Sequence, residues 1–324
     1  MSRLRLSLAC GPYDRVRPLL QGLVAVDGVD LTTLEVSPAS ELFWRVLRHE
    51  EFDIAELSLS NYIMESARGI DRFVAIPVFP HRAFRHSSIW VREDSGLERP
   101  EDLAGRRVGI PEYSMTMLLF TRGFLADDHG VAPSDITWAQ VRPDRIEYDP
   151  PAVALENAPP GATLDDLLAT GAVDAIVTTR VPTLRDTQAR RMFRDPEGVE
   201  AAYYRRTRIF PIMHLVVLRR AVFEANRWLV ANLMSAFQES KAVAYRSIHH
   251  SQPLVSLPWF ALDVEREWSV FDGDPFPYGI EPNLPTLAAA VRWSFEQGLS
   301  PREVSVDDLF PQEARDAFAF HDQR

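Results

Sequence analysis

The pattern of apolar and polar positions in the first 93 residues alternates between that of strands and that of helices. Residues Leu4–Ala9 alternate apolar with polar side chains, as in a half-buried strand. Ser40 begins a predicted helix through His49, whose apolar residues recur every three or four positions. The apolar runs that predict the other strands of this part are Val29–Val36, Phe52–Leu57, Phe73–Phe79 and Ser88–Arg92. Strands that alternate with helices of this length are typical of a parallel α/β sheet.

The same alternation begins again after residue 93 and gives way to helices near the C-terminus. The second series of predicted elements consists of the strands Arg106–Ile110, Ile136–Val141 and Ala172–Thr178 and the helices Met115–Asp127 and Leu164–Thr170. Ile209–Arg219 is then expected to form a long apolar strand, and Val222–Tyr245 the longest helix. The pattern therefore predicts two α/β lobes. The expected boundaries are 1–93 for the first part of lobe 1, 94–205 for lobe 2, and 206–324 for the return to lobe 1 with a helical C-terminal region.

The connection between the predicted strands Phe73–Phe79 and Ser88–Arg92 carries unusual side chains. A sequence normally places Gly, Asn or Asp at such a connection to turn the chain. Residues 81–88 instead contain two arginines, two histidines, an aromatic residue and two hydroxyls. Arginine offers a planar fork of donors to a carboxylate, and histidine can move a proton near neutral pH. The segment suits a pocket for a flat anion, and a solvated basic loop is the alternative.

A second feature follows the predicted strand Arg106–Ile110. Residues 111–116 open a helix, and the free N–H groups and positive dipole end of a helix start attract anions. In open α/β sheets, ligands bind beyond the carboxyl ends of the strands, and lobe interfaces are preferred pocket sites. We therefore expect this helix start and the segment 81–88 to face one cleft, which would bind a dicarboxylate or a similar anion.

Composition and charge narrow the choice of partners. The chain has 324 residues, of which 46% are apolar and 25% charged, as in ordinary globular proteins. The net charge of -11 argues against nucleic acid and against an anionic membrane surface. Cys10 is the single cysteine, which excludes an internal disulfide and a cysteine-based zinc site. The alternating N-terminus lacks the apolar core of a signal peptide, and no 18 apolar residues run together, so we expect a cytoplasmic protein.

Several segments resemble a known family. Phe79–Ile89, Val108–Thr116 and Ile209–His214 are similar to the 4,5-dihydroxyphthalate decarboxylase family. Tyr13–Arg15 and Pro277–Asn283 fit the same family, so the likeness spans most of the chain in the same order. The resemblance implies an α/β, two-lobed type II periplasmic-binding-protein-like fold with a helical C-terminal extension. It also implies a decarboxylase that works inside the cell without a redox cofactor.

Decarboxylation of a hydroxylated aromatic acid defines the roles that such a site must fill. The ring carbon that bears the carboxylate must be protonated, a hydroxyl para to it can supply electron density, and the carboxylates need anchors. We expect His86 to be the proton donor. His214 is a second candidate, because a titratable group within an apolar strand needs a partner. Glu112 could orient a histidine or act as a base.

The remaining candidates are expected to bind the substrate. Arg82 and Arg85 are the predicted carboxylate anchors, and Phe84 could stack on the ring. The other residues expected to bind the substrate are His81, Ser87, Tyr113, Thr116, Asp14 and Arg15. For each candidate the alternative is an ordinary structural role, such as a surface ion pair, a packing residue or a hydrogen-bonded histidine.

Cofactors, partners and rival functions complete the expectations. Three histidines (His81, His86 and His214) with Glu112 could hold a divalent metal, but their spacing matches no established ligand pattern, so we expect no cofactor. The expected partner is a small aromatic carboxylate, and the long helix could also support a homo-oligomer. A solute-binding protein that captures a carboxylate without catalysis is the main alternative. A different enzyme on the same scaffold, such as one of the alternative menaquinone route, is a third.

Overall fold

The structure, a computed structural model, describes residues 3–149, 152–185, 188–249 and 256–319. The chain divides into two compact units. Unit 1 comprises residues 1–82, 212–287 and 305–324, and unit 2 comprises residues 83–211 and 288–304. Both units are mixed α/β structures, so the predicted α/β class is confirmed.

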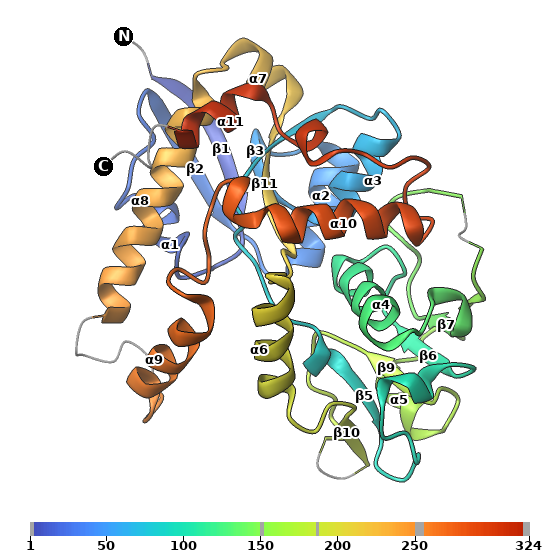
Figure 1. Cartoon of the computed structure of the whole chain (residues 1–324). Coiled ribbons are helices and arrows are strands. Elements are labelled where there is room, and N and C mark those ends of the chain that lie inside the picture. The colour runs from blue at the N-terminus through green and yellow to red at the C-terminus, as the bar shows by residue number, and fades with distance from the viewer. Residues whose placement is uncertain (1–2, 150–151, 186–187, 250–255, 320–324) are drawn as a thin grey trace. The chain divides into compact units, whose positions relative to one another are not determined.

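Unit 1 is built on a five-stranded sheet. Its strands are β1 (Leu4–Cys10), β2 (Val29–Glu35), β3 (Ile54–Ser58), β4 (Phe73–Ile76) and β11 (His214–Arg219), in the order β2-β1-β3-β11-β4. Figure 1 labels four of them, β1, β2, β3 and β11. Strand β1 pairs in parallel with β2 and β3, and β11 runs antiparallel between β3 and β4. Every residue of β3 is buried, because this strand lies in the middle of the sheet.

Helices pack around this sheet with the apolar faces that the sequence predicts. The helices of unit 1 are α1 (Arg17–Leu20), α2 (Ala39–His49), α3 (Leu59–Ala67), α7 (Arg220–Ala225), α8 (Leu229–His249), α9 (Phe260–Phe271) and α11 (Gln312–Ala319). In α2 the predicted apolar face, Leu42, Phe43, Val46 and Leu47, is buried. The predicted single helix Val222–Tyr245 is instead two helices, because Asn226 leaves the helical conformation at φ -146°.

Unit 2 contains a six-stranded sheet. Its strands are β5 (Ile89–Arg92), β6 (Arg107–Ile110), β7 (Thr137–Gln140), β8 (Leu155–Asn157), β9 (Ala175–Val177) and β10 (Ala189–Arg191), in the order β10-β5-β9-β6-β7-β8. The helices that accompany it are α4 (Thr116–His129), α5 (Leu164–Ala169) and α6 (Pro196–Thr207). The short 3₁₀ helices of the chain are η1 (His86–Ser88), η2 (Pro100–Leu103), η3 (Pro133–Asp135), η4 (Glu281–Asn283) and η5 (Val306–Leu309).

Two segments lie in unit 2 that the sequence pattern places in the first lobe. The predicted strand Ser88–Arg92 is β5, which pairs antiparallel with β9 and β10. The chain also returns to unit 2 within α10 (Leu284–Glu296), where the ring of Trp293 meets Phe120 edge-on at 5.6 Å. A Cβ at Gly123 would come within 2.2 Å of the Trp293 ring, so only glycine leaves room for this packing.

Other predicted elements differ in extent. The strand expected over Ile209–Arg219 begins only at His214, after an isolated bridge between Ile212 and Arg82. Residues 142–163, which contain five prolines, include the short edge strand β8. In the part of the chain that the structure describes, no helix is both long and apolar enough to cross a membrane.

Candidate functional site

Glu56 of β3 is the centre of a hydrogen-bonded group in unit 1. Its side chain is fully buried, and its carboxylate accepts hydrogen bonds from the backbone N–H of Gly11 at 2.7 Å and the hydroxyl of Tyr13 at 2.6 Å. The Nδ1 atom of His214 lies 2.5 Å from Glu56 Oε1. Burial alone would raise the pKa of Glu56, but the His214 charge and these hydrogen bonds lower it to about 2. Glu56 is therefore an ionised carboxylate at neutral pH.

The register of two strands brings Glu56 and His214 together. In the antiparallel pair of β3 and β11, His214 lies opposite Ser58 and Val216 lies opposite Glu56. Directly opposite residues share one face of a sheet, so Glu56 and His214 are diagonal neighbours on that face, within reach of long side chains. Cys10 at the end of β1 completes the group, since its Sγ–H donates to Glu56 at 3.4 Å. Burial raises the pKa of Cys10, so the thiol stays protonated.

Aromatic rings fix the orientation of His214. The ring of Phe43 meets the imidazole edge-on at 4.7 Å, and the ring of His81 lies 4.9 Å away. His81 in turn stacks on Tyr13 at 5.5 Å, and the backbone N–H of His214 donates to the carbonyl of His81 at 3.2 Å. Since Nδ1 of His214 is engaged by Glu56, Nε2 is the ring nitrogen that can exchange a proton. His214 is partly exposed, with 14% of its side chain accessible.

Positive side chains of unit 1 accompany this group. Arg15 is mostly buried: it donates to Asp14 and to the carbonyl of Pro80, both at 2.9 Å, and its Cζ lies 3.6 Å from the ring centroid of Phe276. Arg82 is equally buried and donates to Asn283 Oδ1 at 2.6 Å. Unit 1 therefore contains His81, His214, Arg82, Asp14 and Arg15 of the predicted site.

Sequence reasoning missed the residue that organises this site. Glu56 stands inside the otherwise largely apolar run Phe52–Leu57, which was predicted only as a strand. An ionisable residue within a buried strand needs a partner, and this signal could have found it. Tyr13 carries no comparable signal, because its role depends on the position of β3.

His86 lies in unit 2, in an environment that does not favour proton transfer. It is 1% exposed, stacks on Phe124 at 4.0 Å, and meets the rings of Phe193 and Tyr203 edge-on. Burial, with smaller effects from the charges of His129 and Arg206, lowers the pKa of His86 to about 3. Because it is neutral and packed among aromatic rings, His86 fits a core position better than the expected role of proton donor.

The residues next to His86 in the sequence also make their contacts within unit 2. Arg85 is buried, and burial lowers its pKa to about 10 although the Glu200 charge opposes this. Glu200 also accepts from the backbone N–H of Ser87 at 2.9 Å. Phe84 packs against Phe210 at 4.6 Å. These contacts fit a structural role for the segment around η1, and the predicted substrate contacts of Phe84, Arg85 and Ser87 stay predictions.

The predicted residues at the start of α4 also belong to unit 2. Glu112 is buried between Arg142, at 3.0 Å, and Arg145, at 2.9 Å, so its partners are arginines of its own unit. Tyr113 is fully buried beneath the guanidinium of Arg122, whose Cζ lies 3.7 Å from the ring centroid. Thr116 is the first residue of α4 and is buried. The ion pairs of Glu112 favour the alternative of charge compensation over a role as base.

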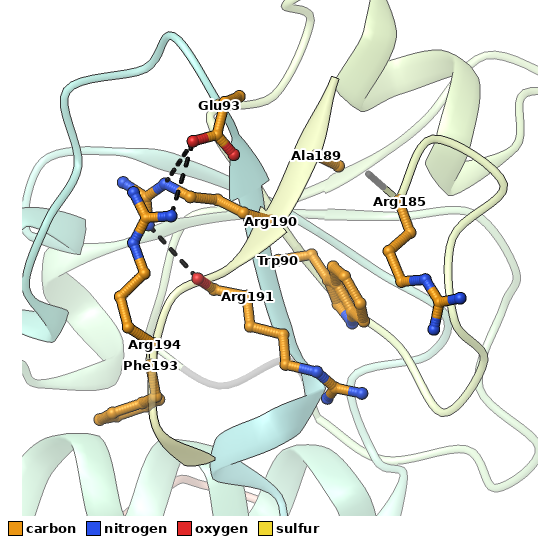
Figure 2. A pocket seen from close by; sticks show the side chains of 8 residues that line it. All are labelled: Trp90, Glu93, Arg185, Ala189, Arg190, Arg191, Phe193 and Arg194. Atoms are coloured by element: carbon orange, nitrogen blue, oxygen red, sulfur yellow. Dashed lines mark hydrogen bonds and ion pairs between the residues drawn. The ribbon is translucent and has the colours of Figure 1, made fainter. Parts of the chain in front are cut away.

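A separate pocket of about 300 Å³ lies at the edge of the unit 2 sheet. The residues that line it are Trp90, Glu93, Arg185, Ala189, Arg190, Arg191, Phe193 and Arg194 (Figure 2). Arg190 donates to the carbonyl of Leu97 and to Glu98, at 2.6 Å and 2.7 Å, and Arg194 lies 3.5 Å from Glu93. Glu93 and Glu98 thus compensate two of these arginines, which fits a role in bracing the edge strand β10.

A metal site would need several ligands at one place. Among the described residues, no group of three or more His, Cys, Asp or Glu side chains could hold a metal ion. The four residues considered as ligands are divided between the units. His81 and His214 belong to unit 1, and His86 and Glu112 belong to unit 2.

Known proteins resemble the chain along almost its whole length, although no family model matches it. It is 39% identical over 329 residues to a 4,5-dihydroxyphthalate decarboxylase of Comamonas testosteroni, covering 98% of this chain and 99% of that protein. It is 43% identical over 215 residues to a 4,5-dihydroxyphthalate decarboxylase of Pseudomonas putida, covering 63% of this chain and 83% of that protein.

Solved structures show the fold. The aliphatic sulphonate binding protein SsuA of Escherichia coli has a TM-score of 0.58 at 16% identity and covers 97% of this chain and 100% of its own. The desulfurization enzyme DSZB has a TM-score of 0.51 at 15% identity, and the match covers 98% of this chain and 100% of DSZB. The predicted periplasmic-binding-protein-like fold is therefore confirmed.

Proposed function

Because the chain belongs to the 4,5-dihydroxyphthalate decarboxylase family, we propose that it converts 4,5-dihydroxyphthalate to 3,4-dihydroxybenzoate (protocatechuate) and carbon dioxide. The observation in the structure that carries the mechanism is the buried pair of Glu56 and His214. A carboxylate on Nδ1 fixes the tautomer of the imidazole and stabilises its protonated form. The pair therefore presents a proton at Nε2, which decarboxylation of an aromatic ring requires.

The reaction needs one proton for each carbon dioxide released. The ring hydroxyl para to the leaving carboxylate loses its proton to water, and the resulting phenolate pushes electron density toward the carbon that bears this carboxylate. His214 delivers its Nε2 proton to this carbon, and a new C–H bond forms. The bond to the carboxylate then breaks, its electron pair restores the aromatic ring, and carbon dioxide leaves. The phenolate takes its proton back from water. Glu56 holds the imidazole in place, and His214 recovers a proton from water for the next turnover.

The positive side chains supply the anchors. Arg15 and Arg82 are buried close to the histidines of unit 1, so they can bind a carboxylate in a region of low dielectric, where ion pairs are strong. The leaving carboxylate must not be held too firmly, because that would stabilise the ground state. The anchors therefore bind the carboxylate that stays on the ring. A cytoplasmic location and a homo-oligomeric state stay predictions.

Turnover tests the proposal directly. Purified protein of known metal content is incubated with 4,5-dihydroxyphthalate, and both 3,4-dihydroxybenzoate and carbon dioxide are followed, with and without a chelator. We expect equal amounts of both products. Activity that survives the chelator supports acid–base catalysis, and activity lost with the metal would make the histidines ligands. Thermal stabilisation by the compound without any product would contradict the proposal and favour a solute-binding protein.

A further inference from the structure

The cationic side chains of this chain are almost all arginines. Of 35 lysines and arginines, 34 are arginines, and the remaining residue is Lys241. Lys241 lies on α8 in unit 1 and is 3% exposed. Lysine and arginine are not interchangeable at buried sites, because the ammonium is a compact point charge with three donors, whereas the guanidinium is a wide planar fork. A single buried lysine in such a chain marks a place where a compact cation is needed.

The hydrogen bonds of Lys241 leave part of its donor capacity unused. Its Nζ atom donates to Asp274 Oδ2 at 2.5 Å and to the carbonyl of Phe276 at 3.0 Å. It also lies 4.5 Å from the ring centroid of Tyr278. Two of the three N–H bonds thus have oxygen acceptors among the described residues. The hydroxyl of Tyr278 is buried and has no hydrogen-bond partner in the described part of the chain.

The segment that contacts Lys241 also contacts the two anchor arginines. Phe276 accepts from Lys241 through its carbonyl, and its ring lies against Arg15. Asn283 accepts from Arg82 and donates to the carbonyl of Gly279, which holds the segment 274–283 around the three cations. Burial lowers the pKa of Lys241, and the positive charges of Arg15 and Arg82 lower it further.

Two buried polar groups beside Lys241 have no hydrogen-bond partner in the described part of the chain. They are the Nε atom of Arg15 and the hydroxyl of Tyr278. The carboxylates that pair with Lys241 and Arg15, which are those of Asp274 and Asp14, are themselves partly exposed. Buried donors without acceptors cost free energy, which a bound anion would recover.

We infer that Lys241, with Arg15, Arg82 and the hydroxyl of Tyr278, forms a subsite for a carboxylate group, and that Lys241 makes the protein prefer aromatic ligands with two adjacent carboxylates over those with one. The assignment of this carboxylate to the substrate rests on the proposed function. Lys241 binds the carboxylate that stays on the ring. It is a specificity-determining residue, and its effect is on affinity, which can be measured without turnover.

Two ligands that differ by one carboxylate test this inference. Phthalate and benzoate lack the ring hydroxyl that drives decarboxylation, so their binding can be followed by titration calorimetry without reaction. We expect Lys241→Met to weaken phthalate binding about tenfold or more and benzoate binding about twofold. Lys241→Arg should recover part of the phthalate affinity. Arg190→Met, which removes an equally buried cation from unit 2, should bind both ligands as the unchanged protein does.

The outcomes separate the inference from the proposed function. Unchanged phthalate binding in Lys241→Met, or an equal loss for both ligands, would overturn the inference even if the unchanged protein turns over 4,5-dihydroxyphthalate. Loss of phthalate preference in a protein without turnover would support the subsite and reject the decarboxylase. If Lys241→Met does not fold, the double variant Lys241→Met/Asp274→Asn removes the whole ion pair and is compared in the same way.

Discussion

The two histidines that the sequence marks as proton donors occupy opposite kinds of environment. His214 of unit 1 shares a hydrogen bond with the ionised Glu56 and keeps part of its ring accessible. His86 of unit 2 is packed against Phe124, and burial lowers its pKa to about 3. A carboxylate partner stabilises a protonated imidazole, whereas burial among apolar rings favours the neutral form. The chemistry of a histidine is therefore decided by the residues that surround it.

After His214 itself, Glu56 should have the largest effect on activity. Glu56→Gln keeps the shape of the side chain but removes the charge that stabilises the protonated His214. We expect kcat to fall about 10²-fold, because the imidazole loses the charged partner that holds its Nδ1 atom. Steady-state rates of 3,4-dihydroxybenzoate formation between pH 5 and pH 9 provide the measurement.

Glu65 provides the matched control for this prediction. It is also buried in unit 1, but it pairs with Arg72. Glu65→Gln should lower the midpoint of thermal unfolding and leave kcat within about twofold, because no hydrogen bond joins it to His214. Equal losses of activity in the two variants would mean that Glu56 acts through stability alone.

Tyr13 should have a smaller effect. Burial raises the pKa of Tyr13, so its hydroxyl remains a donor to Glu56 at neutral pH. Tyr13→Phe removes this hydrogen bond and the longer contact, 3.3 Å, between the hydroxyl and His214 Nδ1, and we expect kcat to fall about three- to tenfold. Tyr62→Phe is the comparison: Tyr62 donates to the carbonyl of Leu309 at 2.9 Å in the same unit, and its loss should cost stability without changing kcat. A full rate in Tyr13→Phe would exclude the hydroxyl from positioning Glu56.

His86 should affect stability in acid. The unfolded chain binds a proton at this residue below pH 6.5, whereas the folded protein does so only near pH 3. The free energy of unfolding therefore decreases as the pH is lowered from 6.5 toward 3. The loss is at most about 1.4 kcal/mol per pH unit. His86→Leu removes this loss, and the difference in unfolding free energy between pH 7 and pH 5 should shrink by about 1–2 kcal/mol in urea denaturation. An unchanged difference would mean that His86 is accessible to protons in the folded state.

Local patterns were sufficient to predict the fold class. The alternation of Leu4–Ala9 and the apolar face of residues 40–49 appear in the structure as β1 and α2. The sequence pattern does not predict that β5 belongs to the sheet of unit 2, because an apolar run does not indicate which strand it pairs with. The segment 288–304 was missed for the same reason, since its place in unit 2 depends on the long-range packing of Trp293.

The site was harder to predict than the fold. The residues 81–88 were singled out for their composition, yet His81 and Arg82 belong to unit 1, whereas Phe84–Ser88 belong to unit 2. Whether a polar residue meets a carboxylate or a phenylalanine depends on neighbours that lie far away in the sequence. Glu56 is 158 positions from His214, and no local signal connects the two.

The most direct test of the account compares the two histidines in one assay. The turnover of 4,5-dihydroxyphthalate is measured for His214→Gln and His86→Leu, and phthalate binding is measured on the same preparations to confirm an intact site. We expect His214→Gln to lose activity by about 10²–10⁴-fold while it still binds phthalate. His86→Leu should retain activity within about threefold. An active His214→Gln variant, or an inactive but folded His86→Leu variant, would contradict the assignment of proton transfer to the pair of Glu56 and His214.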